Sequence, residues 1–161
     1  MEPRIDLMAH RLGAKISKRI YAVNLAIQEA LLPKALQELV ELRVSQINGC
    51  GWCVDVHTKN AAVAGEDATR INLVAAWREA TVYSEAERAA LALAEEGTRI
   101  ADAHQGVSDE TWQQLCKHYD EDQIVGLVSL VAMINAANRL GVITHMQGGS
   151  YDPTMFAALA N

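Results

Sequence analysis

Two cysteines and a histidine lie close together in the sequence, in the order Cys50, Cys53 and His57. If the segment is helical, the step of about 100° per residue puts the three side chains within a sector of roughly 60°. A thiol reacts as its thiolate, and with an ordinary pKa of about 8.5 it is only a few per cent ionised at neutral pH. A neighbouring imidazole can accept the thiol proton and return it later to a leaving group. The spacing therefore predicts redox chemistry at a thiol pair, with His57 as the base for Cys53.

The helix that carries the cysteines contributes only part of the activation. Asn48-Gly49 ends the preceding helix, so that Cys50 opens the next one at its positive end. Lowering a thiol pKa by two units takes about 2.7 kcal/mol. A helix N-terminus typically supplies about 0.3–1 kcal/mol and at most about 2. Because the dipole falls short, a base one turn away is needed.

An imidazole base usually needs a third group to orient it, and the nearest acids in the sequence are Glu38 and Glu41 on the preceding helix. Glu38 is flanked by leucines and is expected to face inward, behind the imidazole or a bridging water, because a carboxylate would repel a thiolate that it touched. The alternative is a solvated Glu38 paired with Lys34 or Arg43. The predicted catalytic residues are Cys53, Cys50, His57 and Glu38.

The thiol pair predicts a peroxide reaction in two steps. One sulfur attacks a peroxide oxygen and becomes a sulfenic acid, and the other condenses with it to a disulfide that external thiols reduce. No cofactor is expected beyond a thiol or dithiol reductant. Zinc held by Cys50, Cys53, His57 and Glu38 is a weaker alternative, because structural zinc sites favour more sulfur, and no metal is predicted. Cys116 has no companion cysteine nearby and is expected to be a structural thiol.

The composition limits the class of protein. The chain has 161 residues, of which 50% are apolar, and a net charge of −6, so a single domain over residues 1–161 is expected. The negative charge argues against nucleic acid or an anionic membrane as a partner. Neither a secretory-signal core nor a run of about 18 apolar residues is found. Three cysteines are too few for a disulfide scaffold, and the chain is expected in the cytoplasm.

Every strong periodic pattern is helical, which predicts an all-α fold of about six to seven helices. Capping boxes at Ser84/Glu87 and Asp120/Gln123 mark two helix starts. The predicted helices cover residues 16–31, 33–47, 50–65, 67–77 and 85–102, with one more from 108 and a last one from 120 to 143. Apolar residues surround the last helix, which predicts burial on all sides and a homo-oligomer whose subunit contacts complete that burial. Trp77 and Trp112 are expected in the core.

The segment over residues 38–59, ELVELRVSQINGCGWCVDVHTK, resembles the core of the alkylhydroperoxidase D-like (AhpD-like) family, in the carboxymuconolactone decarboxylase superfamily. The similarity continues through AWRE at 76–79 and SEAERAAL at 84–91, and resumes at INAANRL over 134–140. It covers most of the chain, with the core motif at about 36–100. The full pattern, E-x₁₁-C-x-x-C-x₃-H after S-Q-I-N-G, is far more specific than C-x-x-C alone.

The resemblance implies an all-helical fold that assembles into trimers or hexamers and reduces organic hydroperoxides. It implies that Cys53 forms the sulfenic acid and that Cys50 is the more accessible resolving thiol, with Glu38 and His57 in a proton relay. The electron donor would be a dithiol, a lipoyl-type group or a redoxin protein. One departure is Trp52, which stands where well-characterised members of the family have a second histidine and which cannot shuttle protons. The alternatives are a redox sensor or disulfide-exchange module, and a decarboxylase-type enzyme of the same superfamily.

Overall fold

The computed structural model describes residues 2–103 and 106–154, and all the regular structure in these ranges is helical. The α-helices are α1 (Arg11–Tyr21), α2 (Val23–Ile27), α3 (Lys34–Asn48), α4 (Gly51–Val63), α5 (Ala68–Leu73), α6 (Glu85–Thr98), α7 (Asp109–His118) and α8 (Glu121–Thr144). Short 3₁₀ helices, η1 (Gln28–Ala30) and η2 (Val74–Ala76), extend α2 and α5. The all-α prediction is confirmed, and the helix expected over 16–31 is divided between α1, α2 and η1.

Local signals in the sequence set most helix ends. Both predicted capping boxes form, at Ser84/Glu87 for α6 and at Asp120/Gln123 for α8. Gly49 ends α3 in the left-handed region at φ 68°, which glycine adopts without strain. Helix α6 ends at Thr98 rather than near residue 102, because the poor helix former Gly97 lies in its last turn.

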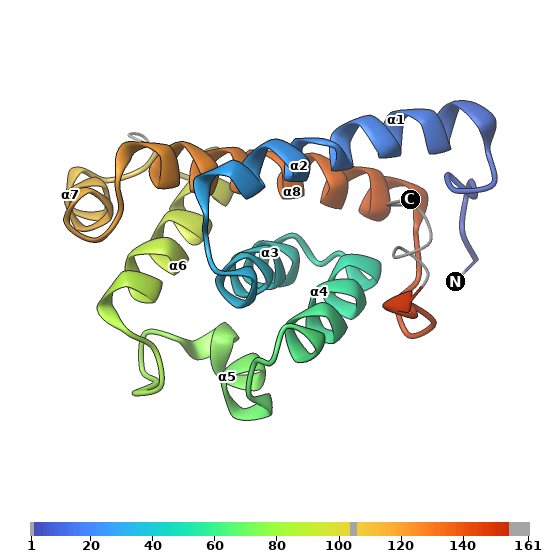
Figure 1. The fold of residues 1–161 in the computed structure, drawn as a ribbon. Helices are drawn as coiled ribbons and strands as arrows, with labels where there is room; N and C mark the ends of the chain where they lie inside the picture. The colour runs from blue at the N-terminus through green and yellow to red at the C-terminus, as the bar shows by residue number, and fades with distance from the viewer. Residues whose placement is uncertain (1, 104–105, 155–161) are drawn as a thin grey trace.

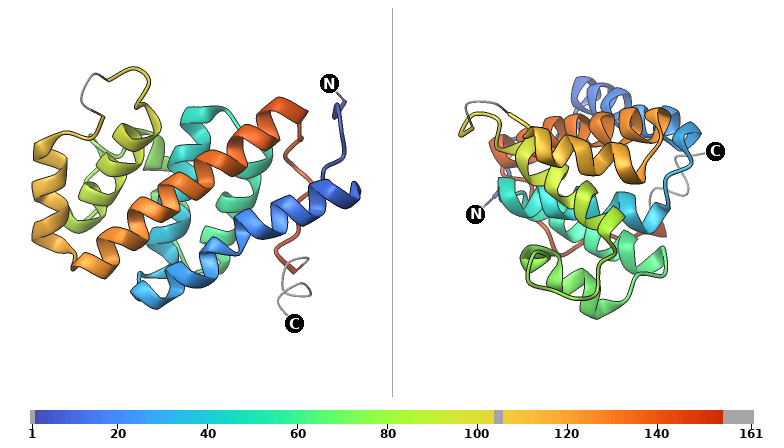
Figure 2. Two further views of the ribbon diagram at one scale, coloured as in Figure 1. Left: turned by 90° about the horizontal axis from the view of Figure 1, so that it is seen from above. Right: turned by 90° about the vertical axis from the view of Figure 1, so that its left-hand side faces the viewer.

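Helix α3 lies at the centre of the fold, packed against α4, α6 and α8 (Figure 1). Helices α1 and α2 run beside α8 and cover the same side of the molecule, as both views in Figure 2 show. One apolar cluster joins α3 to α6, α7 and α8, and a second joins α3 to α4, η2 and the start of α6. The central position of α3 is what places its carboxylates inside the protein.

Polar contacts fix the end of α3 that leads into the cysteines. The side-chain amide of Asn48 donates to the side-chain oxygens of Asn135 and Asn138 on α8, each at 2.9 Å. Asn138 in turn donates to the hydroxyl of Ser45 at 3.0 Å. The Asn-x-x-Asn spacing in the INAANRL segment therefore anchors the turn that precedes Cys50.

Helix α7 departs from two expectations. It packs Thr111 and Leu115 inward, so that Trp112 and Cys116, the next residues around the helix, face outward. Trp112 is 46% exposed and Cys116 is an exposed free thiol. The predictions of a core tryptophan and a structural thiol are wrong at these two positions, whereas Trp77 is buried as expected.

Helix α8 is apolar around its circumference but is not covered on all sides by its own chain. Val125 is 60% exposed and Ile143 is 63% exposed, so the expected complete burial is not reached within one chain, and the oligomer stays a prediction. By length and composition, α8 alone among the described helices meets the criterion for a membrane span, with a mean hydropathy of 1.5. This is weak evidence, because a largely buried core helix meets the same criterion.

Candidate active site

The cysteine pair lies at the start of α4, as the sequence predicts. Cys50 is the N-cap residue, and its sulfur accepts a hydrogen bond from the backbone N–H of Cys53 at 3.3 Å. The two sulfurs are joined as a disulfide. Both cysteines therefore lie at the positive end of the helix dipole, which favours a thiolate once the bond is reduced.

The burial of the two sulfurs reverses one expectation. Cys50 is 1% exposed and Cys53 is 6% exposed, so the prediction that Cys50 is the more accessible sulfur is wrong for this structure. Helix α8 passes so close that a Cβ on Gly141 would lie 2.8 Å from the Cys50 sulfur. The segment after α8 also packs on the start of α4, where a Cβ on Gly148 would clash with the carbonyl oxygen of Gly51.

His57 follows one turn after Cys53 and lies against Glu38 inside the protein. Its Nδ1 is 2.8 Å from Oε2 of Glu38, so the structure brings together the histidine and the carboxylate that the sequence selected. No bridging water is needed at this distance. The catalytic roles of these residues stay predictions.

Glu38 is held by two partners. Its second oxygen, Oε1, forms an ion pair with Nζ of Lys34 at 2.7 Å. Burial alone would raise the pKa of Glu38, but the contacts with His57 and Lys34 outweigh it and hold the pKa below its ordinary value. Glu38 is therefore ionised at neutral pH and fixes the ring of His57.

Glu41 is the site residue that the sequence analysis left unassigned. Its Oε2 lies 3.4 Å from Nδ1 of His57, and the side chain is buried. Burial is the main cause that raises the pKa of Glu41 to about 7, with a further contribution from the Glu38 charge and an opposing one from His57. For His57, burial lowers the pKa, but the two carboxylates outweigh this and raise it. The spacing of Glu38 and Glu41 on one helix face was the available signal.

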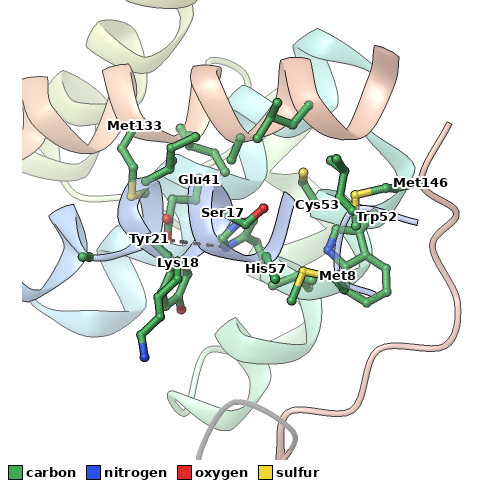
Figure 3. A pocket seen from close by; sticks show the side chains of 18 of the residues that line it. Met8, Ser17, Lys18, Tyr21, Glu41, Trp52, Cys53, His57, Met133 and Met146 are labelled. Carbon is green, nitrogen blue, oxygen red and sulfur yellow. Dashed lines mark ion pairs between the residues drawn. The ribbon is translucent and has the colours of Figure 1, made fainter. Parts of the chain in front are cut away.

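A pocket of about 560 Å³ opens onto this cluster. Cys53, His57 and Glu41 line one wall, and the remaining lining is largely apolar and comes from the N-terminal segment, α1, α2 and α8. In Figure 3, Glu41 and Tyr21 lie toward one end of the pocket, Cys53, Trp52 and Met146 lie toward the other, and His57 lies between them. The pocket thus brings Cys53 and His57 to the surface of one largely apolar chamber.

Trp52 forms part of the pocket wall next to Cys53. Its ring packs edge-on against Tyr151, with ring centroids 5.9 Å apart. An indole in this position adds apolar surface where a second histidine would have added a proton carrier.

One group of described residues has the spacing of metal ligands: Glu38, Glu41 and His57, whose ligand atoms lie within 4.8 Å of one another. Neither cysteine belongs to it, so it differs from the zinc set considered from the sequence. Lys34 occupies one oxygen of Glu38, and the hydrogen bond to His57 occupies the other. Both oxygens of Glu38 are therefore already engaged by protein groups in this structure.

Comparisons with known proteins agree with this geometry. The model of the carboxymuconolactone decarboxylase family matches residues 16–96. The chain belongs to this family. It is 40% identical to the uncharacterised protein YdfG of Bacillus subtilis over 115 residues, which are 71% of this chain and 77% of YdfG. It is 28% identical to the uncharacterised protein YnjA of Escherichia coli over 67% of this chain and 58% of YnjA.

Solved structures place the chain in the AhpD-like branch of the carboxymuconolactone decarboxylase superfamily. A protein of unknown function from Agrobacterium tumefaciens, described as a candidate antioxidant defence protein AhpD, superposes with a TM-score of 0.84 and 32% identity. The match covers 93% of this chain and 100% of that one. The debrominase Bmp8 shares the fold, with a TM-score of 0.72 and 19% identity over 85% of this chain and 73% of Bmp8. The same fold therefore also occurs in a protein named as a debrominase.

Proposed function

We propose that the protein is a thiol-dependent hydroperoxidase that reduces small organic hydroperoxides through Cys53 and Cys50. The observation that carries the proposal is the apolar pocket, which is lined by both Cys53 and His57, and in which His57 is hydrogen-bonded to Glu38. An apolar chamber suits an organic peroxide better than hydrogen peroxide alone, because it buries the alkyl group of the substrate.

The proposed cycle begins with the reduced pair. His57 accepts the proton of Cys53, and the thiolate attacks the terminal peroxide oxygen, so that the O–O bond breaks, an alcohol leaves and the sulfur becomes a sulfenic acid. The Cys50 thiol then condenses with the sulfenic acid, releasing water and forming the disulfide. An external dithiol, a lipoyl-type group or a redoxin protein reduces the disulfide by exchange.

The cellular setting is part of the same proposal. A thiol donor is available in the reducing cytoplasm, where we expect the protein to act. We also expect a homo-oligomer, a trimer or a hexamer, because exposed apolar residues remain on α1 and α8. Light scattering that shows a stable monomer at micromolar concentration would contradict the oligomer without affecting the chemistry.

The test is peroxide consumption by the purified protein with cumene hydroperoxide and hydrogen peroxide. Several reductants should be compared, including dihydrolipoamide and a thioredoxin system. Cys53→Ser is expected to abolish turnover, and Cys50→Ser to block recycling and leave a sulfenic acid that dimedone traps. Cys116→Ser is the matched control, because this thiol is exposed and is not among the described residues that line the pocket. Wild-type rates in the Cys50/Cys53 double serine variant would overturn the assignment.

A second candidate is a redox sensor or disulfide-exchange module for another protein. It would show rapid oxidation of the pair with little turnover under every reductant. The burial of Cys50 bears equally on exchange with such a partner and with a redoxin donor, so the rate of peroxide turnover is what separates the two candidates. A decarboxylase-type reaction is less well supported, because it would leave the cysteine pair without a role.

A further inference from the structure

The two carboxylates of α3 stand one turn apart in different surroundings. Glu38 has a cation, Lys34, on one oxygen and His57 on the other. Glu41 approaches His57 through Oε2, while its Oε1 is buried and accepts no hydrogen bond within the described part of the chain. A buried carboxylate oxygen without a donor is costly, whereas a neutral carboxyl group is far less so.

The two carboxylates also differ in their access to the pocket. Glu41 is part of the pocket lining together with Cys53 and His57, whereas Glu38 does not appear among the described residues that line it. Glu41 can therefore meet a bound substrate, while Glu38 acts only through His57. Figure 3 shows Glu41 and His57 linked on the wall that continues to Cys53.

We propose that Glu41 is the proton carrier of this site, a neutral carboxyl group in the pocket wall that protonates the oxygen leaving the peroxide. This proposal rests on the proposed hydroperoxidase function and assigns Glu38 a different task, the orientation of His57. The carboxylate of Glu41 later recovers its proton from Cys53 through His57.

The steps balance in atoms and charge. The Cys53 thiolate forms a bond to the terminal peroxide oxygen, the O–O bond breaks, the sulfur loses two electrons to oxygen, and the departing alkoxide takes the Glu41 proton to become the alcohol. Condensation of the sulfenic acid with the Cys50 thiol forms the disulfide and releases water. After reduction by the external dithiol, the proton of Cys53 passes through His57 to the Glu41 carboxylate, which restores the starting state.

The surroundings of Glu41 support a carboxyl group that gains and loses a proton near neutral pH. Its pKa is raised to about 7, mainly by burial. Polar and charged groups surround it on α1 to α4. Its pKa is affected by Glu38 and Lys34 from α3, His57 from α4 and Asn24 from α2. Tyr21 and Lys18 from α1 line the same pocket. Helix α8 contributes only apolar side chains to this wall, such as Met133 and Ile134. Lys34, the cation that acts on the pKa of Glu41, is already paired with Glu38.

The kinetic test compares Glu41→Gln with the wild type. The amide keeps the size of the side chain but cannot transfer a proton, so kcat/KM for cumene hydroperoxide is expected to fall about 100-fold. In the wild type the rate should decline as the pH rises through about 7, and this decline should be missing in the variant. Glu79→Gln, a change at an exposed glutamate, is the charge-matched control. An unchanged rate and pH profile in Glu41→Gln would overturn the proposal.

A measurement on the wild type needs neither activity nor a variant. With ¹³C-labelled glutamate, infrared difference spectra should show the C=O band of a protonated buried carboxyl that disappears as the pH is raised through about 7. If no buried glutamate titrates there, Glu41 is not the proton carrier, whatever the enzyme does. If the band titrates but no peroxide is consumed, the proposed hydroperoxidase function is wrong, whereas the finding that the buried carboxyl group of Glu41 binds a proton near neutral pH still holds.

Discussion

Nδ1 of His57 lies 2.8 Å from Oε2 of Glu38, across 19 positions of sequence and the boundary between two helices. This contact fixes the orientation of the His57 ring relative to the pocket. With Nδ1 bound to the carboxylate, Nε2 is the nitrogen left for the pocket, which His57 lines together with Cys53. A carboxylate that holds one ring nitrogen raises the basicity of the other.

This geometry predicts the effect of His57→Ala on the thiols. Without the base, Cys53 keeps only the helix dipole, which is worth at most about 2 kcal/mol. The apparent pKa of the reactive thiol should rise by at least about one unit, and peroxide attack at pH 7 should slow by about 100-fold. The rate of iodoacetamide alkylation of the reduced protein as a function of pH measures the thiol directly. An unchanged titration curve would remove His57 from the mechanism.

Glu41 should lower the stability of the protein as the pH rises. Its pKa is about 7 in the folded chain and 4.5 ordinarily, so the folded state binds more protons than the unfolded state between these values, and the free energy of unfolding falls as the pH increases. At about 1.4 kcal/mol per unit, the loss reaches at most about 3 kcal/mol above pH 7. Urea unfolding at pH 5 and pH 8 should show Glu41→Gln gaining stability over the wild type only at the higher pH. The prediction fails if the difference between the two proteins is the same at both values.

The sequence predicted much of this site because its signals are local. The i, i+3 and i+7 spacing of Cys50, Cys53 and His57, with Gly49 to end α3, depends on the geometry of one helix and one cap. The position of Glu38 depends on the packing of two helices. Its leucine neighbours indicated that it faces inward, and the resemblance to a known family pointed to the same residue. Fold class and capping boxes followed from the same local rules.

The features of the site that the sequence did not predict depend on contacts between segments that are distant in the sequence. Glu41 gains its pKa of about 7 from complete burial beneath α1, α2 and α8, and no local pattern reports that coverage. The burial of Cys50 depends on how closely α8 approaches at Gly141. Trp112 was misplaced because apolar character alone does not show which face of α7 packs inward.

Gly141→Ala tests the close approach of α8 to the cysteines. The added methyl would lie 2.8 Å from the Cys50 sulfur, so α8 or the start of α4 must move, at a cost of roughly 1–3 kcal/mol in the free energy of unfolding. Gly97→Ala is the matched control, since its methyl would meet only Val131 Cγ1, at 3.2 Å, and alanine also favours the helix. Chemical denaturation of the oxidised proteins should separate the two variants. Equal free energies of unfolding for Gly141→Ala and Gly97→Ala would show that α8 does not pack tightly against Cys50.

Asp55 ties the segment after α8 to α4, and its removal should expose Cys50. Oδ2 of Asp55 accepts hydrogen bonds from the backbone N–H groups of Gly149 at 2.7 Å and Tyr151 at 3.0 Å, and Oδ1 pairs with Lys59 at 2.7 Å. Desolvation would raise the pKa of Asp55, but the contact with Lys59, followed by the two backbone bonds, outweighs it and holds the pKa below its ordinary value. Asp55→Ala removes both bonds and the partner of Lys59, so that only Lys59, which donates to the carbonyl oxygens of Gly149 and Tyr151, still ties this segment to α4 through these side chains. The backbone that packs on Gly51, next to Cys50, is then held more weakly. Reduction of the disulfide by dithiothreitol should therefore become several-fold faster, with the rate followed by thiol release. Asp152→Ala is the control, because its side chain is exposed and, among the described residues, accepts hydrogen bonds from Thr154 of the same segment. Equal reduction rates in Asp55→Ala and the wild type would mean that this segment does not limit access to Cys50.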